Sequence, residues 1–295
     1  MVRTILDRGL AEPHHLLVLP DGIAADELEA LAVSRSAEAG WVGQAVIQLS
    51  TGVHLTGPWD LDASLRAAFD LPPWSAQAYL LRCPVQRGGE LPPELRGIDP
   101  MLDAFVEGVP VGAEQEALDH LRAFARRLGG ALRLAGTGAV VVPDPEAAID
   151  LTVFSPVWLD HDACLQVLTS ALPHVRSLLD DIPEEIAREQ VLEGYGIVAE
   201  LGEDLVEISA NGLPTPPTVL RGTDWAADGV VAYEVRWRPR HPESAFAVRP
   251  PLAVRRARTR AGELIEQAAV ALHAVVGGEI SDDDGFLVDP ADLAS

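Results

Sequence analysis

Apolar residues recur every three or four positions in two stretches of the chain, which is the spacing that places them on one face of an α-helix. The first stretch starts near residue 114 and the second near residue 262. Their apolar positions are Ala117, Leu118, Leu121, Phe124, Ala125 and Leu128 in the first, and Ile265, Ala268, Ala269, Leu272, Val275 and Val276 in the second. A glycine pair follows each stretch, and two short apolar runs separated by a turn follow each pair. The pattern therefore predicts helix, glycine pair, strand, turn and strand twice.

Three similarities between the halves of the chain occur in the same order. A shift of 148 positions places Gly129-Gly130 on Gly277-Gly278. Upstream, residues 78–84 and 232–239 each contain Ala-Tyr, then an arginine and a proline. A third similarity, a short apolar run followed by a proline, precedes the first helix-like pattern of each half. Because there are two long copies and no array of short ones, the sequence indicates a duplicated domain and not a solenoid.

Each half shows the order strand, helix, strand, strand, helix, strand, which is that of the ferredoxin-like (βαββαβ) arrangement. Helices on one face of a mainly antiparallel sheet make an α+β domain. We therefore expect a tandem duplication with pseudo-twofold symmetry, whose first repeat is 1–147 and whose second is 148–295. The first repeat carries an insertion at 51–76 and a proline-rich loop at 84–112. Because such repeats satisfy one another within a chain, we expect a monomer with pseudo-dimeric repeats.

The remaining elements are predicted from local patterns and capping residues. Strands are expected at residues 16–19, 41–49, 77–83, 148–154, 195–201, 205–209 and 230–237. Helices are expected at 26–39, at 60–69 with Asp60 as its cap, at 160–171 with Asp160 as its cap, and from Asp181 onward. The insertion at 51–76 is otherwise expected to be irregular.

The charge of the chain narrows the classes of partner and of chemistry. The 295 residues contain 45 acidic and 22 basic residues, a net charge of -23, and every basic residue is an arginine. Strong negative charge argues against binding to nucleic acid, which depends on neutralising phosphates. The absence of lysine excludes a phosphate-binding-loop lysine and a Schiff base with pyridoxal phosphate. No cofactor is expected.

Hydrophobic residues make up 48% of the chain, but none of its apolar runs reaches the ~18 residues of a membrane span. The first eight residues carry charges within the region that a signal peptide would keep apolar. Cys83 and Cys164 lie in different halves and predict no disulfide framework. The sequence therefore predicts a soluble cytoplasmic protein that binds no membrane.

Histidine and cysteine side chains offer few sites for chemistry. His161, Cys164 and His174 include metal-ligand types, but no second pair stands at a recognised spacing, so we expect an ordinary helix start. Cys164 with either histidine is a candidate thiolate pair, and the alternative is a small buried residue. Residues 282–285 are Asp-Asp-Asp-Gly but lack the first and last ligands of an EF-hand loop, so a tight turn is expected. We therefore expect no metal site and no catalytic residue.

An arginine strip at residues 236–260 is the strongest candidate for ligand binding. It holds eight of the 22 arginines against one acidic residue, Glu243. Arg236, Arg238 and Arg240 would share one face of a strand. One interpretation pairs them with carboxylates of the other repeat or of residues 180–189. The other is an anion-binding site that includes Arg236, Arg238, Arg240 and, from the first repeat, Arg82.

Two classes of function follow. We favour a binding or adaptor protein that uses a groove between the repeats or an exposed sheet face to bind a protein whose identity the sequence does not specify. The alternative is an enzyme that acts on a small anionic ligand in a cleft between the repeats, built on Arg82, Arg236 and carboxylates. Tryptophans in predicted loops, such as Trp74 and Trp225, would line a partner surface or close the edge of a small core.

Overall fold

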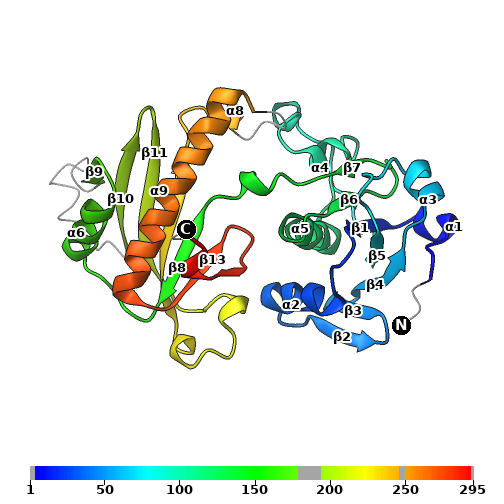
Figure 1. Ribbon diagram of the computed structural model, residues 1–295, viewed down its shortest axis with the longest axis horizontal. Helices are drawn as coiled ribbons and strands as arrows, with labels where there is room; N and C mark the ends of the chain where they lie inside the picture. The colour runs from blue at the N-terminus through cyan, green and yellow to red at the C-terminus, as the bar shows by residue number, and fades with distance from the viewer. Residues whose placement is uncertain (1–3, 179–193, 246–249, 294–295) are drawn as a thin grey trace. The chain divides into compact units, whose positions relative to one another are not determined.

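The structure, a computed structural model, describes residues 4–178, 194–245 and 250–293. It contains two compact units, Met1–Ala147 and Ala148–Ser295 (Figure 1). Within the described residues, each unit has helices and one seven-stranded sheet in which neighbouring strands pair antiparallel. The predicted α+β class is therefore confirmed.

Apart from the short helices α1, α3 and α4, the first unit has a strand and a helix, then four strands, a long helix and two short strands. Its strands are β1 (His15–Leu19), β2 (Gly40–Gly43), β3 (Val46–Ser50), β4 (Val53–Asp60), β5 (Gln77–Arg82), β6 (Ala131–Arg133) and β7 (Val140–Val141). Its helices are α1 (Arg8–Ala11), α2 (Ala25–Arg35), α3 (Ala63–Ala68), α4 (Pro100–Asp103) and α5 (Gly112–Arg127), with single 3₁₀ turns η1 (Pro93–Leu95) and η2 (Pro145–Ala147).

The second unit repeats this order. Its strands are β8 (Leu151–Ser155), β9 (Val175–Ser177), β10 (Gly194–Leu201), β11 (Asp204–Leu213), β12 (Val230–Arg238), β13 (Glu279–Asp282) and β14 (Leu287–Val288). Its helices are α6 (His161–Ala171), α8 (Pro242–Ala245), α9 (Leu252–Val276) and α10 (Pro290–Leu293), with 3₁₀ turns η4 (Thr218–Leu220) and η5 (Asp224–Ala226). The helix predicted from Asp181 onward lies outside the described residues.

The two sheets have the same strand order when strands are matched by their position along each unit. The order is β2-β3-β4-β5-β1-β6-β7 in the first unit and β9-β10-β11-β12-β8-β13-β14 in the second. The registers agree, because Leu17 pairs with Tyr79 in the first sheet and Val153 pairs with Tyr233 in the second. The two units are thus similar domains, and their two tyrosines hold matching places.

The ferredoxin-like topology is not confirmed. That arrangement has four strands, and two stretches of the first unit add strands that the sequence pattern did not reveal. Residues 41–49, predicted as one strand, form the β2–β3 hairpin, because the chain turns at Ala45, whose φ is 149°. Residues 51–76, predicted to be irregular apart from one helix, contain β4. That helix, α3, is capped by Asp62, which accepts a hydrogen bond from the Leu65 N–H at 2.7 Å.

The core of the second unit lies between its sheet and the helices α6 and α9, which cover one sheet face (Figure 1). Alternating residues of each strand point to this face, so Val153, Tyr233 and Ile280 are fully buried there. On the opposite face, the connection between β11 and β12 packs Leu220 and Trp225 against Phe154. Farther along that face, β11 and β12 present the charged side chains Glu207, Glu234, Arg236 and Arg238.

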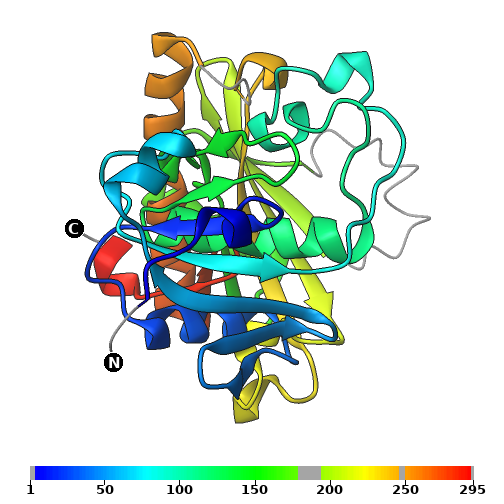
Figure 2. The same cartoon turned by 90° about the vertical axis from the view of Figure 1, so that its right-hand side faces the viewer.

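In the first unit, helices lie on both faces of the sheet. α1 and α3 lie toward the viewer in Figure 2, where α1 is dark blue and α3 lighter blue. Ala11 of α1 and Leu65 of α3, with Leu6 and Phe69 beside these helices, pack against Leu16 and Leu80 of the sheet. The long helix α5 and α2 lie on the other face (Figures 1 and 2).

The helix α9 is a longer counterpart of α5. Each ends next to a glycine pair, but α9 has 25 residues and α5 has 16. With the glycine pairs matched, eight of the nine additional residues lie at the N-terminal end of α9, which gives that helix about two further turns. They contain Arg255, Arg256 and Arg258 of the arginine strip, and Arg260 follows directly.

The edges of both sheets are short strands. β7 and β14 have two residues each, β9 has three and β2 has four. Among the residues that the structure describes, none of the helices has the length and apolar character required to cross a membrane.

Candidate functional site

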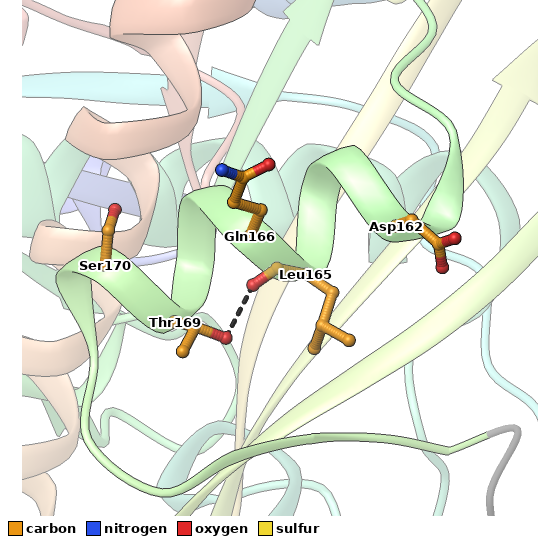
Figure 3. A pocket seen from close by; sticks show the side chains of 5 residues that line it. All are labelled: Asp162, Leu165, Gln166, Thr169 and Ser170. Atoms are coloured by element: carbon orange, nitrogen blue, oxygen red, sulfur yellow. Dashed lines mark hydrogen bonds between the residues drawn. The ribbon is translucent and has the colours of Figure 1, made fainter.

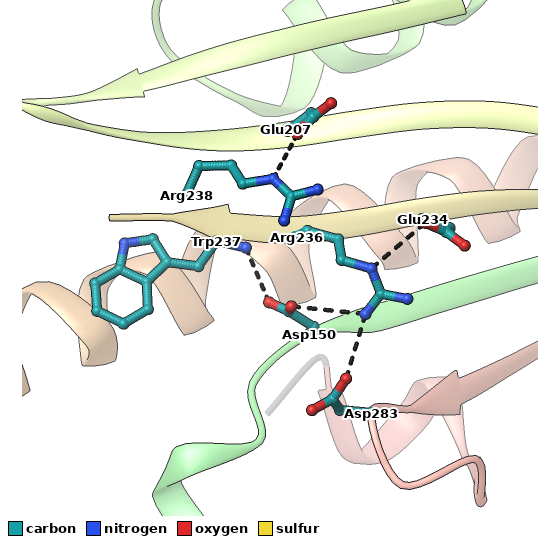
Figure 4. A network of polar contacts seen from close by, with 7 residues as sticks. All are labelled: Asp150, Glu207, Glu234, Arg236, Trp237, Arg238 and Asp283. Atoms are coloured by element: carbon teal, nitrogen blue, oxygen red, sulfur yellow. Dashed lines mark hydrogen bonds and ion pairs between the residues drawn. The ribbon is translucent and has the colours of Figure 1, made fainter. Parts of the chain in front are cut away.

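Three arginines of the strip, Arg236, Arg238 and Arg240, are bound by carboxylates of their own unit. Arg236 NH1 lies 3.3 Å from Asp283 Oδ1 and 3.6 Å from Asp150 Oδ2, and its Nε lies 3.4 Å from Glu234 Oε2 (Figure 4). Burial lowers the pKa of Arg236, but these three carboxylates outweigh it and raise the pKa above its ordinary value. The guanidinium is therefore held charged within a cluster that contains more acids than bases.

Arg238 and Arg240 have partners of the same kind. Arg238 Nε donates to Glu207 Oε2, and Arg240 NH1 donates to Glu203 Oε1 at 2.8 Å. Every carboxylate that these three arginines bind comes from the second unit. The expectation that the other repeat supplies carboxylates stays a prediction, and residues 180–189, the other expected source, lie outside the described residues. Arg82 is exposed on β5 of the first unit, and the structure describes no hydrogen bond or ion pair of its side chain.

The loop between β8 and α6 is fixed by two tyrosines. The Tyr233 hydroxyl accepts a hydrogen bond from the Leu159 N–H at 2.7 Å and donates to the Val157 carbonyl at 2.9 Å. The Tyr195 hydroxyl donates to the Leu159 carbonyl at 2.8 Å. The Trp158 and Tyr195 rings make a T-shaped contact with a centroid distance of 5.6 Å. Val157 and Trp158 are nevertheless 43% and 45% exposed, so the fixed loop presents two apolar side chains to solvent.

Beside this loop, a serine, a histidine and an aspartate form a row of hydrogen-bonded side chains, which are the three residue types of a serine-hydrolase triad. His161 Nε2 lies 2.7 Å from Ser177 Oγ, and His161 Nδ1 lies 2.9 Å from Asp162 Oδ1. Ser177 is only 3% exposed, whereas the Asp162 side chain is 96% exposed. A nucleophile has to reach its substrate, and the carboxylate of a triad is normally the buried member. The row therefore ties the start of α6 to β9.

The histidine and cysteine candidates do not converge. Cys164 is buried, which raises the pKa of its thiol, so a reactive thiolate is disfavoured. His174 is exposed. Within the described part of the chain, no group of three or more metal-ligand side chains is present.

The outer face of α6 carries a shallow hollow of about 470 Å³, lined by Asp162, Leu165, Gln166, Thr169 and Ser170 (Figure 3).

The same unit has a second hollow. It has a volume of about 280 Å³ and lies where the β10–β11 turn, the end of β12 and the start of α9 meet. Its described lining is Leu201, Glu203, Asp204, Trp237, Pro239, Arg240, His241, Ala245, Ala253, Val254, Ala257 and Arg260. Trp237 is 6% exposed, and its Nε1–H donates to Asp204 Oδ2 at 3.3 Å. The aromatic ring is thus held in place as the floor of an apolar pocket with charged edges.

The first unit contains a buried polar network that sequence reasoning missed. Glu114 has no exposed surface; its Oε1 accepts from His15 Nε2 at 3.0 Å and from Arg87 NH2 at 2.7 Å, and its Oε2 accepts from the Gln86 N–H at 2.7 Å. His15 Nδ1 accepts from the Ala135 N–H, so the proton of the neutral ring is on Nε2. Burial is the main reason that the pKa of His15 is lowered.

This network is a structural feature of the loop at 84–112. Arg87 stacks over the Phe105 ring at 4.1 Å, and Gln86 Oε1 accepts the Ala113 N–H that the first turn of α5 leaves open. Burial and the Glu114 charge raise the pKa of Cys83 to about 11, which makes that thiol unreactive near neutral pH. The one sequence signal for this network was Glu114 itself, a glutamate in the first turn of a predicted helix, where an acidic residue is favoured.

Comparison with known proteins supplies no relative for this chain. No family model matches it, and no curated protein or solved structure matches it at a significant level.

Proposed function

We propose that the protein is a binding or adaptor protein, and that the β8–α6 loop of its second unit docks on an apolar surface of a partner protein. The observation that carries the proposal is the exposed pair Val157 and Trp158 on a backbone held by the hydroxyls of Tyr233 and Tyr195. Tryptophan is among the residues that contribute most binding energy at protein interfaces.

The fixed backbone matters for affinity. Binding costs free energy when a loop and its side chains have to be ordered, and a loop that is already ordered avoids much of that cost. Three hydrogen bonds hold both sides of Trp158. A solvent-exposed tryptophan on a flexible loop would lack this advantage.

The alternative, an enzyme that acts on a small anionic ligand, has weaker support. Arg236, Arg238 and Arg240 are engaged by carboxylates, so an anion would have to displace them. Ser177 is buried and the thiol of Cys164 has a raised pKa. These features favour a role in binding over one in catalysis.

We also infer that the two units descend from one duplicated domain. The identical strand order, the matched pairs Leu17–Tyr79 and Val153–Tyr233, and the glycine pairs after α5 and α9 support this inference. In both units the four strands around the first one, such as β4-β5-β1-β6, follow the order of the split βαβ arrangement. A ferredoxin-like ancestor extended at both edges is consistent with that order.

The proposal is tested by affinity capture with the full chain. Immobilised parent protein, the Trp158→Ala variant and the Trp74→Ala variant are exposed to an extract of the producing cells, and retained proteins are quantified by mass spectrometry. Trp74 is a matched control because it is also exposed, at 39%, but lies in the first unit. We expect a protein that the parent and Trp74→Ala retain and that Trp158→Ala retains about tenfold less. Equal retention by all three proteins would exclude this loop as the docking surface.

A further inference from the structure

The additional N-terminal turns of α9 carry arginines that lack the carboxylate partners of the β12 strip. Arg255, Arg256 and Arg260 are exposed, and the structure describes no ion pair for any of them. Among the described residues, the one bond described for a guanidinium of Arg255, Arg256 or Arg260 runs from Arg260 Nε to the Arg256 carbonyl at 3.4 Å. Arg258 differs, because it is buried and donates to the Ala245 carbonyl at 2.9 Å.

This placement is unfavourable within the folded chain. The N-terminal end of a helix is its positive end, where cationic side chains are disfavoured. Arg256 and Arg260 are also four positions apart, so their like charges face each other along the helix. Because the structure describes no ion pair that would neutralise Arg256 or Arg260, a negatively charged partner would relieve this repulsion.

The pocket floored by Trp237 adjoins the same helix face. Ala253, Ala257 and Arg260 line the pocket and recur at the spacing of one helix face. Its volume of about 280 Å³ lies just below the ~300–1,000 Å³ that is usual for small-molecule sites. The pocket therefore suits an apolar side chain of a bound segment better than a whole cofactor.

We propose that this surface, formed by Arg256, Arg260 and the Trp237 pocket, binds an acidic peptide segment of a partner protein. Carboxylates of the segment pair with the two arginines, and one apolar side chain of the segment enters the pocket. Nucleic acid is the less favoured anion, because the net charge of -23 repels a long polyanion whereas a short segment meets chiefly the local arginines.

The site is separate from the β8–α6 loop. Trp237 lies at one end of β12, and Val231, six residues earlier, pairs with Ser155 where that loop begins. Six residues of a strand span about 20 Å. The proposed site thus goes beyond the Trp158 surface, and a loss of binding at either surface leaves the other measurable.

The test uses a fluorescein-labelled peptide of six glutamates around a central phenylalanine, with fluorescence anisotropy of the full-length protein. Arg256→Gln with Arg260→Gln removes the two charges. Arg8→Gln with Arg82→Gln is the matched control, because both of these arginines are exposed in the first unit and have no described ion pair. We expect Kd to rise about tenfold in the first double variant and less than about twofold in the control.

The pocket is tested separately. Ala253→Leu, which adds bulk to the pocket lining, should weaken binding of the phenylalanine peptide to the level of a peptide with alanine at its centre. The melting temperature of Arg256→Gln with Arg260→Gln should not fall, because no described partner is lost. The proposal is overturned if that variant binds the peptide as the parent does, if the control loses as much, or if a single-stranded oligonucleotide or inorganic phosphate competes better than unlabelled peptide.

Discussion

Gly130 packs closely on the backbone of Val18 in the first unit, and Gly278 packs in the same way on the backbone of Phe154 in the second unit. A Cβ added to Gly130 would lie 2.6 Å from the Val18 carbonyl oxygen, and one added to Gly278 would meet the Phe154 carbonyl oxygen more closely still. Val18 pairs with Ala131 and Phe154 with Glu279, which are the residues that follow the two glycines. The second glycine of each pair is therefore required by the approach of the returning chain to the first strand.

Replacing either glycine should destabilise its unit. We expect Gly130→Ala and Gly278→Ala to lower the free energy of unfolding by about 2 kcal/mol or more, because the backbone has to shift to accept a Cβ. The control is Gly129→Ala, where the space is open but φ is +63°, so only about 1 kcal/mol is expected for the left-handed backbone. Urea unfolding of the three variants measures the difference; equal losses would contradict the close-approach explanation.

Removing Glu114 should be among the most destabilising changes in the first unit. Glu114→Ala leaves Arg87 and His15 without their buried acceptor, and we expect a loss of about 3–5 kcal/mol. Glu116→Ala, on the exposed side of the same helix, should change stability by less than about 0.5 kcal/mol. Thermal and urea unfolding distinguish the two, and a mild effect of Glu114→Ala would show that the network contributes little.

Tyr233→Phe should loosen the β8–α6 loop without changing its exposed side chains. The variant loses the hydrogen bonds to Val157 and Leu159, for which we expect a cost of about 1–2 kcal/mol. The specific readout is hydrogen exchange of the Leu159 amide, which donates to the tyrosine hydroxyl in the parent protein. Its exchange should accelerate in Tyr233→Phe. Unchanged protection of this amide would mean that the hydroxyl does not hold the loop.

His120 should make stability depend on pH. Burial, assisted by the adjacent Arg35, lowers the pKa of His120 to about 4, and its Nδ1 accepts a hydrogen bond from Arg35 Nε. As pH falls below the ordinary value of 6.5, the unfolded chain takes up a proton at His120 and the folded chain does not, so stability decreases.

Because the ring is partly exposed, we expect His120 to contribute on the order of 1 kcal/mol to this decrease between about pH 7 and pH 5. His120→Asn, which keeps a hydrogen-bond acceptor near Arg35, should lose correspondingly less stability over the same interval. Urea midpoints at the two pH values test this. An equal decrease in both proteins would assign the pH dependence to other groups, such as His15, whose pKa is also lowered.

Repeated local signals made much of the architecture predictable. The apolar periodicity of α5 and α9 and the glycines that follow them gave the helices and the two-copy order. Strand β4 was not predicted, because Gly57-Pro58 interrupts the alternation of apolar residues that Val53 and Leu55 begin. Its pairing with β5 stabilises the strand despite this interruption. Long-range pairing of this kind leaves little trace in the sequence of one strand.

The polar sites were less predictable because they depend on residues far apart in the sequence. Glu114 contacts His15 across 99 positions, and no local pattern marks that pair. The charge of Arg236 was evident from the sequence. Its partners Asp150 and Asp283 are 133 positions apart in the sequence, and they come close because β8 and β13 pair in the sheet. The assembly state and the cytoplasmic location stay predictions.

The short border strands bear on how the protein behaves when it is concentrated. A sheet recruits a further strand through a continuous row of backbone donors and acceptors, and β7 and β14 offer only two residues each. In β2 the register shifts between Trp41 and Gly43, which breaks that row despite the exposed Val42. These borders make the folded chain a poor seed for fibrils, so accidental aggregates should arise through unfolding and not through stacking of native sheets.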